Sequence, residues 1–162
     1  MSELRLMHLL LQAASHGHLE DVDDVVLGRT DVNKEVNNFG QTALHFASIN
    51  GHLAVVEKLL ARGANARKVD KRKQTALHWA SKSGHLNVVN ALLTRGGADV
   101  DQMDELKQTA LHLASRQGNL DVVATLRDHR ADVNKVDFCR QTPLHLASKM
   151  GHLNVVVALL WS

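Results

Sequence analysis

The stretch TALHFASINGHLAVVEKLL, residues 42–60, decides the fold because it recurs along the chain. TALHFA at Thr42 returns as TALHWA at Thr75, TALHLA at Thr109 and TPLHLA at Thr142, in steps of 33, 34 and 33 residues. A glycine nine residues after each threonine opens GHLAVVEKLL, GHLNVVNALL, GNLDVVATLR or GHLNVVVALL. Self-similarity at a fixed period of this size indicates a stack of repeats.

Each unit reads as two short helices separated by the glycine. In the second helix of the first quoted unit, Leu53, Val56 and Leu60 recur at the interval that lines one helical face. The helix before it has only about eight residues, too short to persist alone in water. The helices must therefore pack on neighbouring units, so the stack is the stable object.

These repeats resemble the ankyrin-repeat family, whose unit is a β-turn hairpin followed by two antiparallel helices. A degenerate first unit aligns at an offset of 34 residues, with Ala13 and Gly17 in the places of Ala47 and Gly51. The resemblance implies an all-α fold, an ankyrin-repeat solenoid of stacked helix-turn-helix units with short β-turn hairpin loops. We expect one domain over residues 1–162, with units at approximately 1–36, 37–69, 70–103, 104–136 and 137–162.

Composition agrees with such a fold and indicates a reducing, intracellular compartment. Apolar residues make up 44% of the chain but aromatic residues only 3%, so the core must be built from Leu, Val and Ala. The single cysteine, Cys139, cannot form an internal disulfide, and the N-terminus has no apolar signal segment. No run approaches the ~18 apolar residues of a membrane span. We therefore expect an intracellular protein, cytoplasmic or nuclear, that does not enter a membrane.

Several units depart from the family pattern at positions where it places a glycine. Gly40 keeps the turn glycine two residues before the threonine, but three later turns replace it. The replacements are Lys73, Lys107 and Arg140. Arg130 similarly replaces the glycine that ends the second helix in earlier units, Gly63 and Gly96. A non-glycine residue with positive φ costs roughly 1 kcal/mol.

The second helices also predict where the stack is interrupted. Arg127 stands where other units have the stacking leucines Leu60 and Leu93, so we expect a softer joint between units 104–136 and 137–162. Asp21 replaces a repeated valine, which would make the first unit a polar cap. The last helix has no such change. We expect its apolar face to mediate self-association through Val157, Leu160 and Trp161.

The recurring histidines are of a residue type that binds metals, but their spacing indicates a structural role. One equivalent histidine per unit would lie ~10 Å from the next in stacked helices, whereas zinc needs ligands within about 2.0–2.1 Å of one ion. The family resemblance instead implies hydrogen bonds to the threonine and to the neighbouring turn. These histidines are His45, His78, His112 and His145. His52, His85 and His152, which begin the second helices, receive the same interpretation.

We find no catalytic constellation. Cys139 has no assignable base beside it, and the glycines follow the repeat rather than clustering into a phosphate loop. We therefore predict a protein that is not an enzyme, with no cofactor, no metal site and no small-molecule substrate. Glutamines recur just before each threonine, and such a row of polar side chains could contact a partner. They are Gln41, Gln74, Gln108 and Gln141.

The family resemblance implies a concave groove between hairpin tips and inner helices where a protein partner binds. Carried over position by position, the tip contacts are Asn38, Phe39, Lys71, Arg72, Glu105, Leu106, Phe138 and Cys139. The corresponding inner-helix contacts are Ile49, Asn50, Lys82, Ser83, Arg116, Gln117, Lys149 and Met150. Several of these residues are apolar although their positions have no role in the core. The centres of protein interfaces are enriched in such residues. Basic residues surround them, which favours a protein partner with an acidic surface.

Other interpretations stay open at this point. The basic residues could be solvated surface decoration, the commonest role of charged side chains. A basic groove would also suit nucleic acid, although stacking aromatics and a recognised reading module are missing. The chain could also be a segment of a larger scaffold that self-associates. The partner's identity and the oligomeric state do not follow from the sequence.

Overall fold

The computed structural model describes residues 3–18 and 31–161, and in this part of the chain every regular element is a helix. The N-terminal helix is α1 (Glu3–His16). The inner helices are α3 (Ala43–Asn50), α5 (Ala76–Ser83), α7 (Ala110–Gln117) and α9 (Pro143–Met150). The outer helices are α4 (Leu53–Ala61), α6 (Leu86–Thr94), α8 (Leu120–Asp128) and α10 (Leu153–Leu160).

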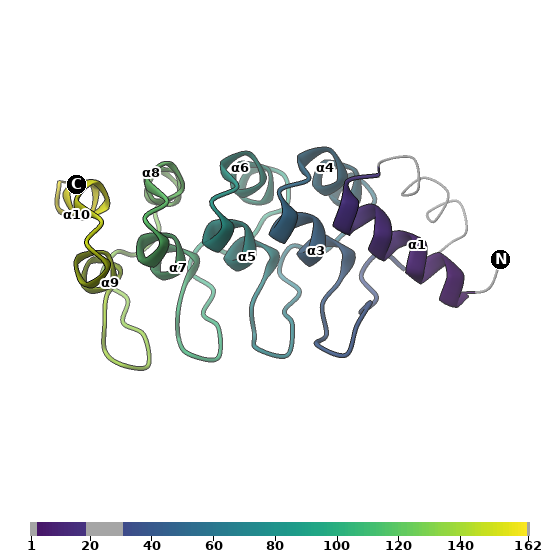
Figure 1. The fold of residues 1–162 in the computed structure, drawn as a ribbon, viewed down its shortest axis with the longest axis horizontal. Helices are drawn as coiled ribbons and strands as arrows, with labels where there is room; N and C mark the ends of the chain where they lie inside the picture. The colour runs from purple at the N-terminus through teal and green to yellow at the C-terminus, as the bar shows by residue number, and fades with distance from the viewer. Residues whose placement is uncertain (1–2, 19–30, 162) are drawn as a thin grey trace.

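The helices form two layers, and a hairpin loop projects from the stack before each of α3, α5, α7 and α9 (Figure 1). Successive units lie side by side, so that the two ends of the chain lie at opposite ends of the stack (Figure 1). This arrangement confirms the expected all-α solenoid. The second helix of the first unit falls outside the described residues, as does Asp21, on which the polar cap was predicted.

Each inner helix begins and ends on the repeated motif. Thr75, in an extended conformation at φ −91° and ψ 170°, precedes α5, and its N–H donates to Nδ1 of His78 at 3.1 Å. At the other end, Gly84 adopts the left-handed conformation with φ 78°, and its N–H donates to the Ala80 carbonyl. Left-handed glycine is the usual end of a helix because it has no Cβ to clash. The motif therefore limits the inner helix to eight residues.

The histidine that caps the inner helix also reaches forward to the next unit. Since Nδ1 accepts the threonine N–H, Nε2 carries the proton and donates to a carbonyl of the following hairpin. Nε2 of His45 lies 3.1 Å from the Gln74 carbonyl oxygen, and that of His78 lies 3.1 Å from the Gln108 carbonyl oxygen. His112 repeats the contact with Gln141 at 3.1 Å. The structural interpretation of these histidines is confirmed.

A second row of polar side chains reaches backward. Nε2 of His52 lies 3.0 Å from the Ser15 carbonyl oxygen, and that of His85 lies 2.9 Å from the Ile49 carbonyl oxygen. His152 makes the same bond to Arg116 at 3.0 Å. Asn119, which stands at this position in the third motif, donates to the Ser81 carbonyl at 2.9 Å. Each accepting carbonyl lies at the C-terminal end of an inner helix, where four carbonyls lack an intrahelical partner.

Leucine, valine and alanine form one continuous core, as the composition predicted. The inner helices contribute a buried leucine and a buried alanine from each unit; these include Leu44, Leu77, Leu111, Ala47, Ala80, Ala114 and Ala147. The outer helices contribute Val56, Val89, Val123, Leu59, Leu92 and Leu126. The small alanines let neighbouring inner helices approach closely. Burial of this apolar surface supplies the main stabilising term of the stack.

The three hairpins that precede α5, α7 and α9 are each held by an acidic side chain, whereas Asn37 takes this place before α3. Oδ1 of Asp70 accepts the N–H of Arg72 and the N–H of Gln74, both at 2.9 Å. Asp104 and Asp137 repeat this arrangement in the next two hairpins. All three carboxylates are buried, and backbone N–H groups satisfy them. A carboxylate in this position fixes the turn locally.

The four recurring glutamines differ in their contacts. Nε2 of Gln74 donates to Oδ2 of Asp104 in the next hairpin at 3.0 Å, and Gln108 reaches Asp137 in the same way at 3.5 Å. Gln41 and Gln108 are buried. Gln74 and Gln108 thus join neighbouring hairpins, whereas Gln41 bonds to Asn37 within its own hairpin and Gln141 is half-buried.

The expected strain at the replaced glycines is present. Lys73, Lys107 and Arg140 have φ of 58°, 57° and 59°. Arg130 has φ of 64°, as predicted. One assignment was wrong: Gly97 (φ 59°), not Gly96, is the left-handed residue after α6. Gly96 is needed for another reason, since a Cβ there would lie 2.7 Å from the Leu92 carbonyl oxygen.

The joint between the last two units contains a polar bridge that the sequence did not predict. Arg127 is half-buried, and its Nη1 donates to the Ala158 carbonyl at the end of α10. Its Nη2 donates to the Trp161 carbonyl at 3.4 Å. The arginine thus replaces the apolar contact of a leucine by binding carbonyls that the helix end leaves open. A softer joint stays a prediction.

We predict that acid destabilises the stack through the forward-reaching histidines. Burial lowers the pKa of His45, His78 and His112 below 6.5, and a proton on Nδ1 would remove the acceptor for the threonine N–H. The unfolded chain, with ordinary histidine pKa values, then binds more protons below about pH 6.5, so stability is lost as the pH falls through that region. The urea midpoint should fall between about pH 7.5 and about pH 5.5.

The control for this prediction is His145, which keeps the Thr142 contact at 2.7 Å but is exposed. The His145→Gln variant should keep the fall of the urea midpoint in acid, because the three buried imidazoles remain. A urea midpoint that does not change over this range would show that the buried imidazoles are protonated as easily in the folded state.

We also predict that restoring the turn glycines stabilises the protein. Each of Lys73→Gly, Lys107→Gly and Arg140→Gly should raise the free energy of unfolding by about 0.5 kcal/mol, because the relief of positive-φ strain exceeds the added entropy of the unfolded chain. Urea unfolding would measure the change. Arg116→Gly, inside helix α7, should have the opposite sign. Loss of stability in all three turn variants would mean that the lysine and arginine side chains contribute contacts that outweigh the strain.

Candidate protein-binding groove

A groove runs along the stack between the hairpins and the C-terminal halves of the inner helices. We call it the inner groove and define it by three hollows, one at each joint between neighbouring units from residue 37 onward. Arg72 lines both the first and the middle hollow, and Leu106, Arg116 and Met150 line both the middle and the last. The shared residues make the three hollows one continuous surface.

The first hollow has two aromatic walls. Phe39 comes from a hairpin tip and is 67% exposed, and Trp79 comes from α5. Nε1 of Trp79 donates to Oδ2 of Asp70 at 3.2 Å, which fixes the indole plane. The ammonium of Lys82 lies 5.3 Å from the indole ring centre, within the range of a cation–π contact. Lys71 and Arg72 complete the hollow.

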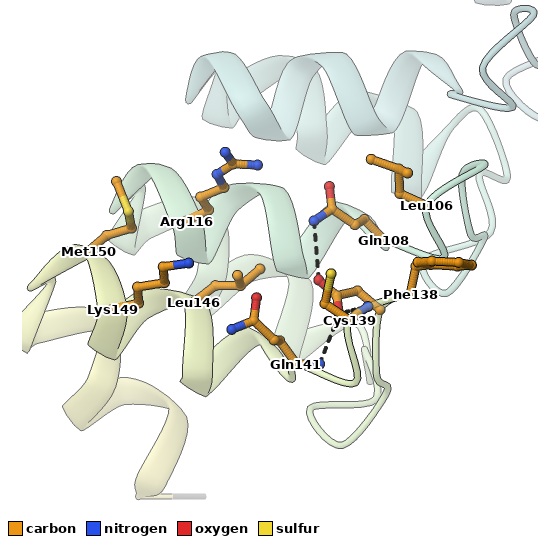
Figure 2. Close-up of a pocket in the computed structure, with 10 residues that line it drawn as sticks. Leu106, Gln108, Arg116, Phe138, Cys139, Gln141, Leu146, Lys149 and Met150 are labelled. Atoms are coloured by element: carbon orange, nitrogen blue, oxygen red, sulfur yellow. Dashed lines mark hydrogen bonds between the residues drawn. The ribbon is translucent and has the colours of Figure 1, made fainter.

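The last hollow combines apolar anchors with basic side chains (Figure 2). Arg116, Lys149 and Met150 come from α7 and α9 on one side, while Leu106 and Phe138 come from hairpins on the other. Phe138 is 72% exposed, and Leu106 and Met150 are each 51% exposed. Cys139, Gln141 and Leu146 lie between the two sides (Figure 2). An apolar side chain of a partner would remove these anchors from water.

The middle hollow is more polar. Lys82, Arg116 and Gln117 line it from the helices, and Glu105 and Leu106 from the hairpin. Glu105 is an exposed acidic residue of a groove that is otherwise basic. The tip backbones beside it are already paired, since the N–H of Glu105 donates to the Arg72 carbonyl at 2.9 Å.

Comparison with known proteins agrees with this architecture. The family described as "Ankyrin repeats (3 copies)" matches residues 10–104 and 96–162. The chain belongs to the ankyrin-repeat family. Ankyrin repeats are generic protein–protein interaction modules, so a protein-binding role follows at that level.

One curated relative matches part of the chain. It is the E3 ubiquitin-protein ligase XBAT33 of Arabidopsis thaliana, 42% identical over 52 residues. The match covers 32% of this chain and 10% of the relative. The chain therefore matches about a tenth of the relative's length, and the relative's activity is not transferred to it.

The structure brings together most of the residues that the ankyrin resemblance marked as contacts. Those that line a hollow are Phe39, Lys71, Arg72, Lys82, Glu105, Leu106, Arg116, Gln117, Phe138, Cys139, Lys149 and Met150. Four other marked residues line none of the three: Asn38, Ile49, Asn50 and Ser83. Ile49 is also half-buried rather than exposed. The first unit of the groove is therefore less open on its helix side than expected.

Sequence reasoning missed two sets of residues. Trp79, expected as core or groove lining, forms a wall of the first hollow and was absent from the contact positions. A row of partly exposed apolar residues directly precedes the hairpin carboxylates but lines none of the three hollows: Val69, Met103 and Val136 are 36%, 37% and 46% exposed. The sequence contains a pattern that could have identified them. An apolar residue occupies the same position of each of these units, in a turn where stability alone favours a polar residue.

The basic residues of the inner groove are not neutralised by the protein. Among the described residues, Lys82, Arg116 and Lys149 form no ion pair with a carboxylate. The nearby carboxylates of Asp70 and Asp104 are buried and accept backbone N–H groups. The ion pair of Arg95 with Glu57, at 2.7 Å, lies between outer helices. The groove thus presents positive charge that its own side chains leave unpaired.

Within the described part of the chain, no group of three or more His, Cys, Asp and Glu side chains is placed to hold a metal ion. Cys139 is an exposed free thiol in the last hollow. None of the described helices is long and apolar enough to cross a membrane.

Proposed function

We propose that the chain is a non-catalytic interaction module whose inner groove binds a partner protein through an acidic surface. The observation that carries this proposal is the row of three exposed, unpaired cations on neighbouring units, Lys82, Arg116 and Lys149. They lie beside exposed apolar anchors in the same hollows. The proposal requires no cofactor, metal or small-molecule substrate.

The two kinds of groove residue would contribute differently. Phe39 and Phe138 are more than two-thirds exposed and contribute little to the core. Burial of such aromatic residues against a partner would supply binding energy, since aromatic side chains dominate interface centres. The cations would instead guide association and select against basic partners. The binding residues proposed are the sixteen contacts marked by the family resemblance, with Trp79 added.

The domain organisation and location are part of the same proposal. We propose that all five units act as one domain, because the forward and backward hydrogen bonds connect each described unit to its neighbours. A reducing intracellular compartment fits the exposed free thiol of Cys139.

Capture of partners from a cell lysate tests the proposal, with the double variant Lys82→Glu/Arg116→Glu as the groove control. Arg95→Gln is the matched surface control because its guanidinium pairs with Glu57 on the outer helices. A partner retained by the unmodified chain and by Arg95→Gln, but lost from the double variant, is expected. A partner retained equally by all three would place its site elsewhere.

We predict that the groove variants separate into two kinetic classes. The double variant Lys82→Glu/Arg116→Glu should lower the association rate of the captured partner about tenfold, with a change in unfolding free energy within about 0.5 kcal/mol. Phe39→Ala and Phe138→Ala should mainly raise the dissociation rate. Surface plasmon resonance at low and high salt would measure both. Unchanged rates in all variants would move the interface off the inner groove.

Nucleic acid is the alternative ligand of a basic groove. A single-stranded oligonucleotide would bind with an affinity that falls steeply with salt, because binding releases counterions from phosphates. The groove offers Trp79 and Phe39 as exposed or half-exposed rings in one hollow, rather than a series of stacking aromatics along its length. Protein is therefore the better supported partner.

We also propose that the outward face of α10 binds a second copy of the chain. Its side chains are exposed and apolar, with Leu153 71%, Leu160 59% and Trp161 78% exposed. We predict that Val157→Ser/Leu160→Gln/Trp161→Gln removes concentration-dependent self-association, as measured by light scattering. A monomeric unmodified chain at high concentration would contradict this role for the face.

A further inference from the structure

The three unpaired cations of the inner groove are arranged in a regular row. Lys82, Arg116 and Lys149 occupy the same position in the last turn of α5, α7 and α9. Neighbouring members line a common hollow, Lys82 with Arg116 in the middle one and Arg116 with Lys149 in the last. The equivalent residue one unit earlier is Ile49, at the end of α3. The row therefore consists of one apolar position followed by three basic positions.

The backbone of the groove is not available to pair with a partner strand along this row. At successive hairpin tips, the N–H of Lys71 donates to the Phe39 carbonyl at 2.9 Å, and the N–H of Phe138 donates to the Leu106 carbonyl at 2.8 Å. Glu105 donates to Arg72 between them. Addition of a partner strand requires a free edge. Recognition must therefore occur through side chains.

The repeat distance limits which backbone conformation can match the row. Helices packed side by side lie about 8–10 Å apart. A polyproline II segment has three residues per turn and rises about 3.1 Å per residue, so every third side chain faces the same direction about 9.3 Å further on. In a β-strand, residues three apart face opposite sides. An α-helix would need an acidic residue at about every seventh position to cover the same distance.

Building on the proposed function, we propose that the inner groove binds an extended acidic segment in the polyproline II conformation. A carboxylate at every third residue pairs in turn with Lys82, Arg116 and Lys149. An apolar side chain at one end of the run, three residues from the nearest carboxylate, enters the hollow between Phe39 and Trp79. Charge complementarity specifies the acidic residues, and the unit spacing specifies their period.

Two residues further limit where the carboxylates of the segment can bind. Glu105 projects into the middle hollow from the hairpin side and disfavours carboxylates there, which directs the acidic residues toward the helix row. The ammonium of Lys82 already lies over the Trp79 ring. A carboxylate that binds Lys82 draws the ammonium toward the groove and changes the environment of the indole. The fluorescence of Trp79 therefore reports occupancy at this position.

Synthetic peptides with differently spaced glutamates test the period. The probe is Leu-Pro-Pro-Glu-Pro-Pro-Glu-Pro-Pro-Glu, prepared also in the reverse order because the row does not define a chain direction. The first comparison peptide places the three glutamates consecutively, and the second is an alanine-based helix with a glutamate at every seventh residue. Binding is measured by fluorescence in the Trp161→Phe background, which leaves Trp79 as the remaining tryptophan of the two.

The spaced peptide, in one of its two orders, should bind about tenfold more tightly than the consecutive peptide, because the consecutive peptide loses two of three ion pairs. It should also bind more tightly than the helical peptide. Arg116→Gln combined with Gln117→Arg keeps the net charge but moves the central cation, and should abolish this preference. Glu105→Gln should strengthen binding about twofold. Arg95→Gln removes a cation from the outer helices and should change nothing.

Each other outcome overturns the inference in a distinguishable way. Equal binding of the spaced and consecutive peptides would reject the period, and tighter binding of the helical peptide would reject the extended conformation. If no peptide binds while a lysate partner still depends on Lys82 and Arg116, the acidic segment is rejected and the interaction module stands. Loss of that dependence would reject the proposed function as well.

Discussion

The structure depends on the buried imidazole that joins each hairpin to the unit before it. In His78, Nδ1 accepts the N–H of Thr75 and Nε2 donates to the Gln108 carbonyl, so one neutral ring caps its own helix and binds the next repeat. A net contribution of about 1 kcal/mol per hydrogen bond is modest, but a buried donor or acceptor left without a partner costs about 1–3 kcal/mol. The ring therefore fixes the relative position of adjacent units as well as stabilising them.

That positioning is what creates a binding surface. Because the forward bonds hold the hairpins and the backward bonds hold the inner-helix ends, side chains at these two places are left to face the groove. The side chains of Asp70 and Gln74 form hydrogen bonds within the stack, whereas the side chains of their neighbours Lys71 and Arg72 line the first hollow. The same hairpin thus separates residues that build the stack from residues that can contact a partner.

Residues that depart from the repeat pattern are also held by hydrogen bonds of the stack. Lys107 and Arg140 keep a left-handed turn despite the strain, because the aspartate of each hairpin binds the backbone on both sides of it. Arg127 replaces a stacking leucine yet finds carbonyl acceptors at the end of α10. Strain or polarity is tolerated where fixed hydrogen-bonding groups surround it.

The sequence by itself determined the repeat and the packing of short helices on neighbouring units, because helices of about eight residues do not persist alone in water. Its resemblance to the ankyrin family implied the all-α solenoid and the histidine hydrogen bonds. Most of the contact residues that the resemblance implies line the inner groove. Tertiary structure decided the rest, since burial depends on what lies in the neighbouring unit. Ile49 became half-buried, Gln74 and Gln108 bound the adjacent hairpin, and Trp79 lined a hollow with Phe39 from the unit before it. A pattern within one repeat does not contain these contacts, which exist only once two repeats are stacked.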